Sequence, residues 1–82
     1  MFWNYFHNRF AKLVQKGTTD EVFQLMDSDY KFSKKAQEAL ILRKNEAEIR
    51  GYFIRKRVLS DENQVLLIEQ MPSEIFDLIE HQ

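Results

Sequence analysis

An apolar spacing that recurs three times is the feature that most limits how this chain can fold. Each copy has a pair of apolar residues, a glutamate eight residues after the first of them, and a second apolar pair four residues further on. The copies begin at Leu13, Leu40 and Leu66, with the glutamates at Glu21, Glu48 and Glu74. The period is therefore about 27 residues, a size typical of units that stack because each has an apolar face that it cannot bury alone.

Residues that begin helices lie between these apolar pairs. Ser33 and Ser60 are in N-cap positions, where a hydroxyl accepts a hydrogen bond from an otherwise unpaired backbone N–H. Thr18 and Glu21 have the spacing of a capping box, and the same spacing recurs from Asn45. We therefore expect six helices, at roughly 2–15, 19–27, 34–43, 46–57, 61–70 and 73–80.

The apolar pattern predicts the fold class. In the second helix of each unit the apolar residues are spaced i, i+3, i+4, which places them on one inward face. These stripes are Val22, Leu25 and Met26, then Ile49, Tyr52 and Phe53, then Ile75, Leu78 and Ile79. Denser apolar runs at 39–42 and 65–68 are also compatible with buried strands, but the flanking Lys, Gln, Glu and Ala favour helix. Gly51, in the middle of an expected helix, indicates either a close approach of two helices or a tolerated defect. The prediction is one all-α domain, residues 1–82, built as a stacked solenoid of three two-helix repeats or as a compact bundle.

The spacing, the caps and the recurring glutamates resemble those of two-helix solenoid repeats, closest to short HEAT-like units, over residues 10–82. The tetratricopeptide and ankyrin signatures are absent, and both have longer periods. The resemblance implies a protein-binding scaffold, because such repeats generally present an extended concave surface. It implies no functional role for any individual residue.

Composition excludes several classes of protein. Apolar residues at 44% and charged residues at 30% are ordinary for a folded domain and argue against disorder. The chain has no cysteine, so disulfides and thiolate chemistry are excluded. The N-terminus lacks the basic start and the cleavage site of a signal peptide. No window approaches the roughly 18 consecutive apolar residues of a membrane span. We therefore expect a cytoplasmic protein with no membrane partner.

The net charge of −1 conceals an uneven distribution. Residues 1–57 contain twelve basic and seven acidic residues, whereas 58–82 contain six acidic residues and no Lys or Arg. Opposite charges at the two ends can orient self-association or steer a partner, or they can neutralise each other within one fold. A homo-oligomer is therefore one expected arrangement.

No grouping of residues indicates catalysis, a cofactor or a metal. His7 and His81 lie near opposite ends of the chain, and neither has a second histidine at the i, i+4 spacing of a metal site. Asp27 and Asp29 could begin a calcium loop, but the glycine and the bidentate glutamate of such a loop are missing. No Ser/His/Asp grouping or glycine-rich phosphate loop occurs. We expect a protein that is not an enzyme and holds neither cofactor nor metal.

A basic stretch over 34–57 supports an alternative function. Arg50 and Arg57 are seven residues apart, hence on one face of the expected helix 46–57, which could be the recognition helix of a helix-turn-helix. The basic residues of this nucleic-acid-binding surface are Lys34, Lys35, Arg43, Arg50 and Arg57. Against it, the turn lacks the usual glycine, the domain as a whole is not basic, and Glu46 can pair with Arg50 at i, i+4.

Aromatic residues are concentrated at the N-terminus, where five of the eleven fall in the first ten positions. The stripe that we assign to the core comprises Trp3, Phe6, Phe10 and Leu13. Phe2 and Tyr5 lie off that stripe, and exposed aromatic side chains are typical anchors of protein interfaces. The same residues could instead close the end of a solenoid.

The leading prediction is a non-enzymatic protein–protein interaction module that acts as a small adaptor, regulator or inhibitor. Its candidate contacts are Phe2, Tyr5, Arg43, Arg50, Arg55 and Arg57. Salt separates this function from nucleic-acid binding, because contacts to phosphate weaken steeply as salt rises whereas an aromatic-centred protein contact changes little.

Overall fold

The chain folds into helices in a computed structural model, which describes residues 2–71, with side chains from Arg9 onward. Within this range there are five helices and no strand, as expected for an all-α protein. The helices are α1 (Phe2–Lys16), α2 (Thr19–Asp27), α3 (Lys34–Leu42), α4 (Glu46–Ile54) and α5 (Asp61–Gln70). The helix expected at 73–80 lies outside the described residues.

Polar caps begin four of these helices at the positions that the sequence marks. Thr18 Oγ1 accepts a hydrogen bond from Glu21 N at 3.2 Å, and Glu21 Oε1 accepts one from Thr18 N at 3.0 Å, which completes the expected capping box. Ser33, Asn45 and Ser60 cap α3, α4 and α5 by accepting from the backbone N–H three residues further on. Each cap satisfies an N–H that the helix itself leaves unpaired, so the chain has little freedom in where these helices start.

Helix α4 is shorter than the sequence predicts. It ends at Ile54 rather than at residue 57, and Lys56 adopts a left-handed φ of 59°. That conformation does not continue a right-handed helix, so the chain leaves the helix axis before Arg57. The prediction that Arg50 and Arg57 share a helix face is therefore wrong.

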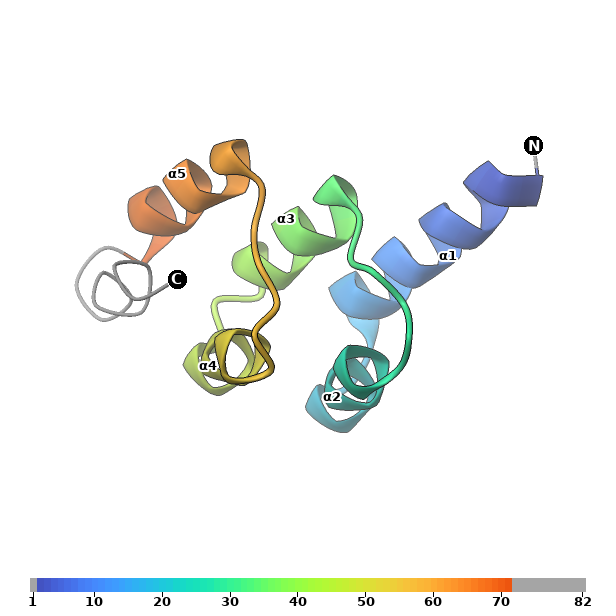
Figure 1. Ribbon diagram of the computed structural model, residues 1–82, viewed down its shortest axis with the longest axis horizontal. Helices are drawn as coiled ribbons and strands as arrows, with labels where there is room; N and C mark the ends of the chain where they lie inside the picture. The colour runs from blue at the N-terminus through green and yellow to red at the C-terminus, as the bar shows by residue number, and fades with distance from the viewer. Residues whose placement is uncertain (1, 72–82) are drawn as a thin grey trace.

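The helices form two layers that the chain visits in turn. α1, α3 and α5 lie in one layer and α2 and α4 in the other, where Figure 1 shows them nearly end-on. Helices two apart in the sequence are therefore neighbours within a layer. The same side-chain hydrogen bond, from a glutamine to a backbone carbonyl, occurs at the start of α3 and at the start of α5. Gln37 Nε2 donates to Phe32 O at 2.9 Å at the start of α3. Gln64 Nε2 donates to Leu59 O at 3.1 Å at the start of α5.

The core lies between the two layers and contains the first two predicted stripes, while the third, at Ile75, Leu78 and Ile79, lies outside the described residues. The buried stripe residues are Val22, Leu25 and Met26 of α2 and Ile49 and Tyr52 of α4, while Phe53 is half-buried. They belong to one cluster with Val14, Leu40 and Leu67 from the other layer, each no more than 1% exposed. Burying one aliphatic side chain of this size contributes about 2 kcal/mol, so this cluster is the main source of stability.

A series of aromatic rings links the outer side of α1 to the core. The ring centroids of Phe10 and Tyr30 are 4.5 Å apart, and those of Tyr30 and Phe32 are 5.3 Å apart. Phe32 then meets Tyr52 edge-on at 5.3 Å. Tilted and edge-on ring pairs each add about 1 kcal/mol beyond the burial of their area. The segment between α2 and α3 is thereby fixed against both helix layers.

Gly51 allows α2 and α4 to approach closely. A Cβ at Gly51 would lie 2.5 Å from Cε1 of Phe23 and 3.0 Å from Nη1 of Arg55, both well inside van der Waals contact. The ring of Phe23 therefore occupies the space that a side chain would need. Of the two interpretations of Gly51, close helix approach and tolerated defect, the structure supports the close approach.

Gly51→Ala is expected to lower the free energy of unfolding, although alanine is the better helix former. Helix propensity favours alanine by about 1 kcal/mol, but an overpacked side chain costs about 1–3 kcal/mol. Urea unfolding of Gly51→Ala, Phe23→Leu and the double variant measures the coupling between the two sites. We expect Gly51→Ala to be destabilising alone and stabilising beside Phe23→Leu. Equal effects in the two backgrounds would contradict the steric explanation.

The Tyr52 hydroxyl is sensitive to alkaline pH because of where it lies. Its side chain is buried, and its hydroxyl donates a 2.7 Å hydrogen bond to Val58 O. Burial raises the pKa of Tyr52 to about 12, because the tyrosinate form would be removed from water, although the nearby cation of Arg57 opposes this in part.

The raised pKa predicts how stability changes with pH. An unfolded tyrosine has a pKa of about 10, so the contribution of Tyr52 is fully present below that value and is lost as the pH rises towards 12. The near-ultraviolet absorbance of tyrosinate should show one late ionisation, which Tyr52→Phe removes and Tyr30→Phe leaves in place. A late ionisation that survives in Tyr52→Phe would show that another tyrosine is responsible.

Candidate interaction surface

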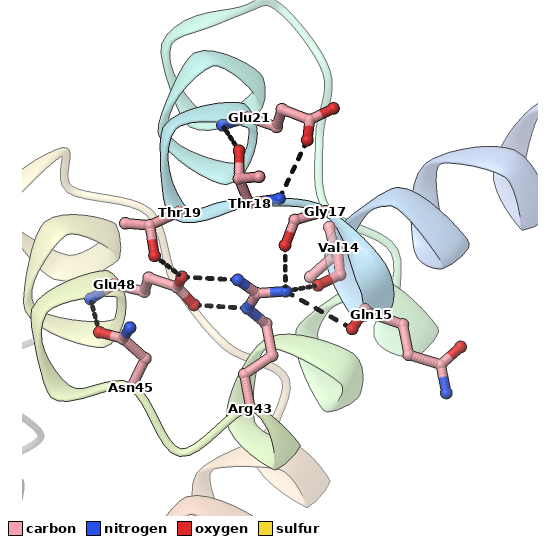
Figure 2. Close-up of polar contacts among 9 residues, drawn as sticks. All are labelled: Val14, Gln15, Gly17, Thr18, Thr19, Glu21, Arg43, Asn45 and Glu48. Atoms are coloured by element: carbon pink, nitrogen blue, oxygen red, sulfur yellow. Dashed lines mark hydrogen bonds and ion pairs between the residues drawn. The ribbon is translucent and has the colours of Figure 1, made fainter.

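Arg43 and Glu48 form a buried ion pair where four helices meet (Figure 2). Arg43 Nε lies 2.6 Å from Glu48 Oε1, and Arg43 Nη2 lies 2.8 Å from Glu48 Oε2, so the pair is bidentate. The Glu48 side chain is 0% exposed and that of Arg43 is 16% exposed. The hydrogen bonds to Glu48 raise the pKa of Arg43 further above its usual value. A pair held this way excludes water and fixes the geometry of both groups.

The remaining donors of Arg43 complete the end of α1. Arg43 Nη1 donates to Val14 O and to Gly17 O, each at 2.8 Å. The last carbonyls of a helix have no partner within it and carry partial negative charge, so a guanidinium there is favourable. On the other side, Thr19 Oγ1 donates to Glu48 Oε2 at 2.8 Å from the start of α2. Figure 2 shows the pair between these two helix ends.

Arg57 likewise donates hydrogen bonds to the backbone at the end of α2. Its guanidinium donates to Met26 O from Nε at 3.0 Å and from Nη2 at 2.7 Å. It also donates to Ser28 O at 2.9 Å and to Tyr30 O at 2.7 Å, and it lies over the ring of Phe32 at 5.5 Å. Arg57 therefore stabilises the end of α2 and the segment that follows it.

Arg55 joins α4 to α2 from the outside. Arg55 Nε lies 2.6 Å from Asp27 Oδ1, and its guanidinium is 5.0 Å from the centre of the Phe23 ring. The hydrogen bond to Arg55 lowers the pKa of Asp27, which keeps that carboxylate ionised. The guanidinium also donates to Gly51 O at 3.0 Å.

The structure therefore separates the four candidate arginines by what their guanidinium groups contact. Arg43, Arg55 and Arg57 donate to residues far from them in the sequence, in α1, in α2 and in the segments that follow these helices. Arg50 is exposed and pairs with Glu46 at 2.7 Å, the i, i+4 pair that the sequence allows. The candidate lysines lie elsewhere: Lys34 is 3.6 Å from Glu62, and both Lys34 and Lys35 are exposed. Phe2 and Tyr5 lie in the first turns of α1, and their side chains lie outside the described part.

An apolar groove is the feature that the sequence did not reveal. It is shallow, has a volume of about 520 Å³ and lies against α1, α2 and the segment after α2. Its lining residues are Phe10, Leu13, Glu21, Gln24, Leu25, Ser28, Asp29 and Tyr30. The sequence assigned Phe10 and Leu13 to the core. Both pack against the core cluster, but each is only half-buried. Glu21 and Asp29 are exposed and supply the only charges among the described residues that line the groove.

Among residues 2–71, no group of three or more His, Cys, Asp or Glu side chains is placed to hold a metal ion. None of the helices in that range combines the length and apolarity needed to cross a lipid bilayer. No protein family, curated protein or solved structure matches this chain.

Replacing Arg43 by lysine is expected to destabilise the protein by about 2 kcal/mol or more, because one ammonium cannot replace the bidentate contact and the two carbonyl contacts. Glu48→Gln should cost about 3 kcal/mol, since it leaves a buried cation without its counter-charge. Arg50→Lys is the matched control, and an exposed i, i+4 pair predicts a loss below about 0.5 kcal/mol. Urea unfolding measures all three. Similar losses for Arg43→Lys and Arg50→Lys would contradict a central role for the buried pair.

Proposed function

We propose that this chain is a non-enzymatic protein-binding module, acting as a small adaptor, regulator or inhibitor. The observation that carries the proposal is the groove beside α1 and α2. Small apolar grooves rimmed by polar residues are typical of sites that accept side chains from a partner. Aromatic residues such as Phe10 and Tyr30 are enriched in protein interfaces and often supply their binding energy.

A stacked-repeat scaffold is part of the same proposal. The cap at Thr18 recurs one period later at Asn45, and the cap at Ser33 recurs one period later at Ser60. The glutamine hydrogen bond at the start of α3 recurs at the start of α5. Alternation between two layers is the arrangement of two-helix solenoids, including HEAT-like repeats. These features support three two-helix units whose exposed faces are available to a partner.

The contacts of the arginines favour protein binding over nucleic-acid binding. Phosphate recognition depends on guanidinium donors that are free to reach the backbone of the nucleic acid. Arg43 and Arg57 use their donors on carbonyls and a carboxylate within the protein. We retain Phe2, Tyr5 and the exposed Arg50 as candidate partner contacts in addition to the groove.

The test is capture of partners from a lysate by the tagged protein, washed at low and high salt, with half of each sample treated with nuclease. We expect a discrete protein that survives both nuclease and high salt, because an apolar contact is insensitive to both. Arg50→Gln should weaken its capture, whereas Lys12→Gln, a matched change at another exposed cation, should not. Recovery of nucleic acid at low salt only, with any protein lost on nuclease treatment, would overturn the proposal in favour of nucleic-acid binding.

A further inference from the structure

The groove faces away from the rest of the helical array. On α2, Thr19, Phe23 and Asp27 lie on the side that contacts α4, through Glu48, Gly51 and Arg55. At 100° per residue, Glu21 and Leu25 lie on the opposite side of that helix. The groove therefore opens at the N-terminal end of the two layers, where Figure 1 shows no further helix of the described chain beyond α1 and α2.

The same positions one period later are covered. Leu40 and Glu48 are the counterparts of Leu13 and Glu21 in the second unit, and they are 1% and 0% exposed. There the preceding helix pair packs over them, and Thr19 reaches Glu48 directly. In the first unit Leu13 is half-buried and Glu21 is exposed. The groove thus corresponds to an interface that is occupied in the second unit and open in the first.

The open position differs in chemistry from the occupied one, which points to a different occupant. Gln24 stands where the second unit has Gly51, the residue that admits the Phe23 ring. Lys16 occupies the position that Arg43 has in the second unit, where the guanidinium of Arg43 donates to carbonyls at the end of α1. The two features by which the second unit receives the first are therefore missing, which argues against a further copy stacked as the first unit is on the second.

Charge identifies the partner that fits. The floor is apolar and partly aromatic, and among the described residues that line it the two charged ones are both acidic and none is basic. The hydrogen bonds from Thr18 lower the pKa of Glu21, so its carboxylate is ionised at neutral pH. We propose that this groove binds an amphipathic helix of a partner protein, with apolar side chains against Leu13 and Leu25 and Lys or Arg beside Glu21 and Asp29. The proposal rests on the protein-binding function above and names its site and the chemistry of its partner.

Three labelled peptides of equal length test this inference by fluorescence anisotropy. The first has leucines at i, i+3, i+4 and i+7 flanked by lysines, the second replaces the lysines by glutamates, and the third replaces the leucines by serines. Because the groove needs both an apolar stripe and positive flanks, the first peptide should bind at least about tenfold more tightly than the other two. Equal binding of the lysine and glutamate peptides would overturn the inference.

Glu21→Gln with Asp29→Asn removes both acidic charges while a glutamine at position 21 still accepts the bond from Thr18 N. Two exposed ion pairs predict a loss in affinity for the lysine peptide of roughly three- to tenfold. The matched control is Glu38→Gln with Glu69→Gln, two exposed acids on α3 and α5 that change the net charge equally. A similar loss in both double variants would show non-specific attraction and would contradict the site.

Backbone NMR shifts of the unaltered protein locate the peptide without any substitution. They should change around Leu13, Leu25 and Tyr30, and changes confined to α4 and α5 would overturn the proposed site. Sedimentation without peptide tests a second copy as the occupant. Self-association that Glu21→Gln with Asp29→Asn abolishes would replace the partner helix by that copy. If this double variant captures the same lysate protein as the unaltered chain does, the groove inference fails and the protein-binding function stands. If the unaltered chain captures no protein, the protein-binding function itself fails.

Discussion

A guanidinium and a carboxylate that are nearly sealed from water join the ends of four helices. Transfer of two ions from water costs several kcal/mol for each, so Arg43 and Glu48 are tolerable only because each nitrogen and oxygen of the two charged groups has a hydrogen-bond partner. In the described part of the chain, no buried side-chain nitrogen or oxygen lacks one. A shift of α1 and α2 by a single turn against α3 and α4 would separate Arg43 from the carbonyls of Val14 and Gly17. The pair therefore fixes how the helix pairs are positioned more than it adds to their stability.

Local features of the sequence were sufficient for most of the fold. The caps specify where α2, α3, α4 and α5 start, and the i, i+3, i+4 stripes specify which faces are buried, because both depend on residues within one helix. The end of α4 could not be predicted in this way. Residues 54–57 contain no glycine or proline, and the helix stops where Lys56 turns left-handed and Arg57 reaches back to Met26 O on α2. That contact belongs to the tertiary structure.

The candidate site was harder to predict than the fold for the same reason. A stretch rich in arginine has the composition of a binding surface. The spacing of those arginines does not show that their guanidinium groups bind backbone carbonyls of α1 and α2, about 30 residues earlier in the chain. Phe10 and Leu13 have the apolar spacing of core residues, and they do pack on the core. They are half-exposed because they line the groove, and the apolar pattern within one helix does not show which neighbours cover it.

Arg43 and Arg57 both complete helices that precede them in the chain. Arg43 donates hydrogen bonds to the end of α1, and Arg57 donates them to the end of α2. These two helices end at Lys16 and Asp27, well before either arginine in the sequence. During synthesis, the first two helices therefore emerge with terminal carbonyls that only water can satisfy. They acquire their permanent hydrogen bonds once the second helix pair and the turn after it have been made. The ends of α1 and α2 are thus completed by residues that are translated after them, which sets an order for assembly that the two-layer arrangement alone does not impose.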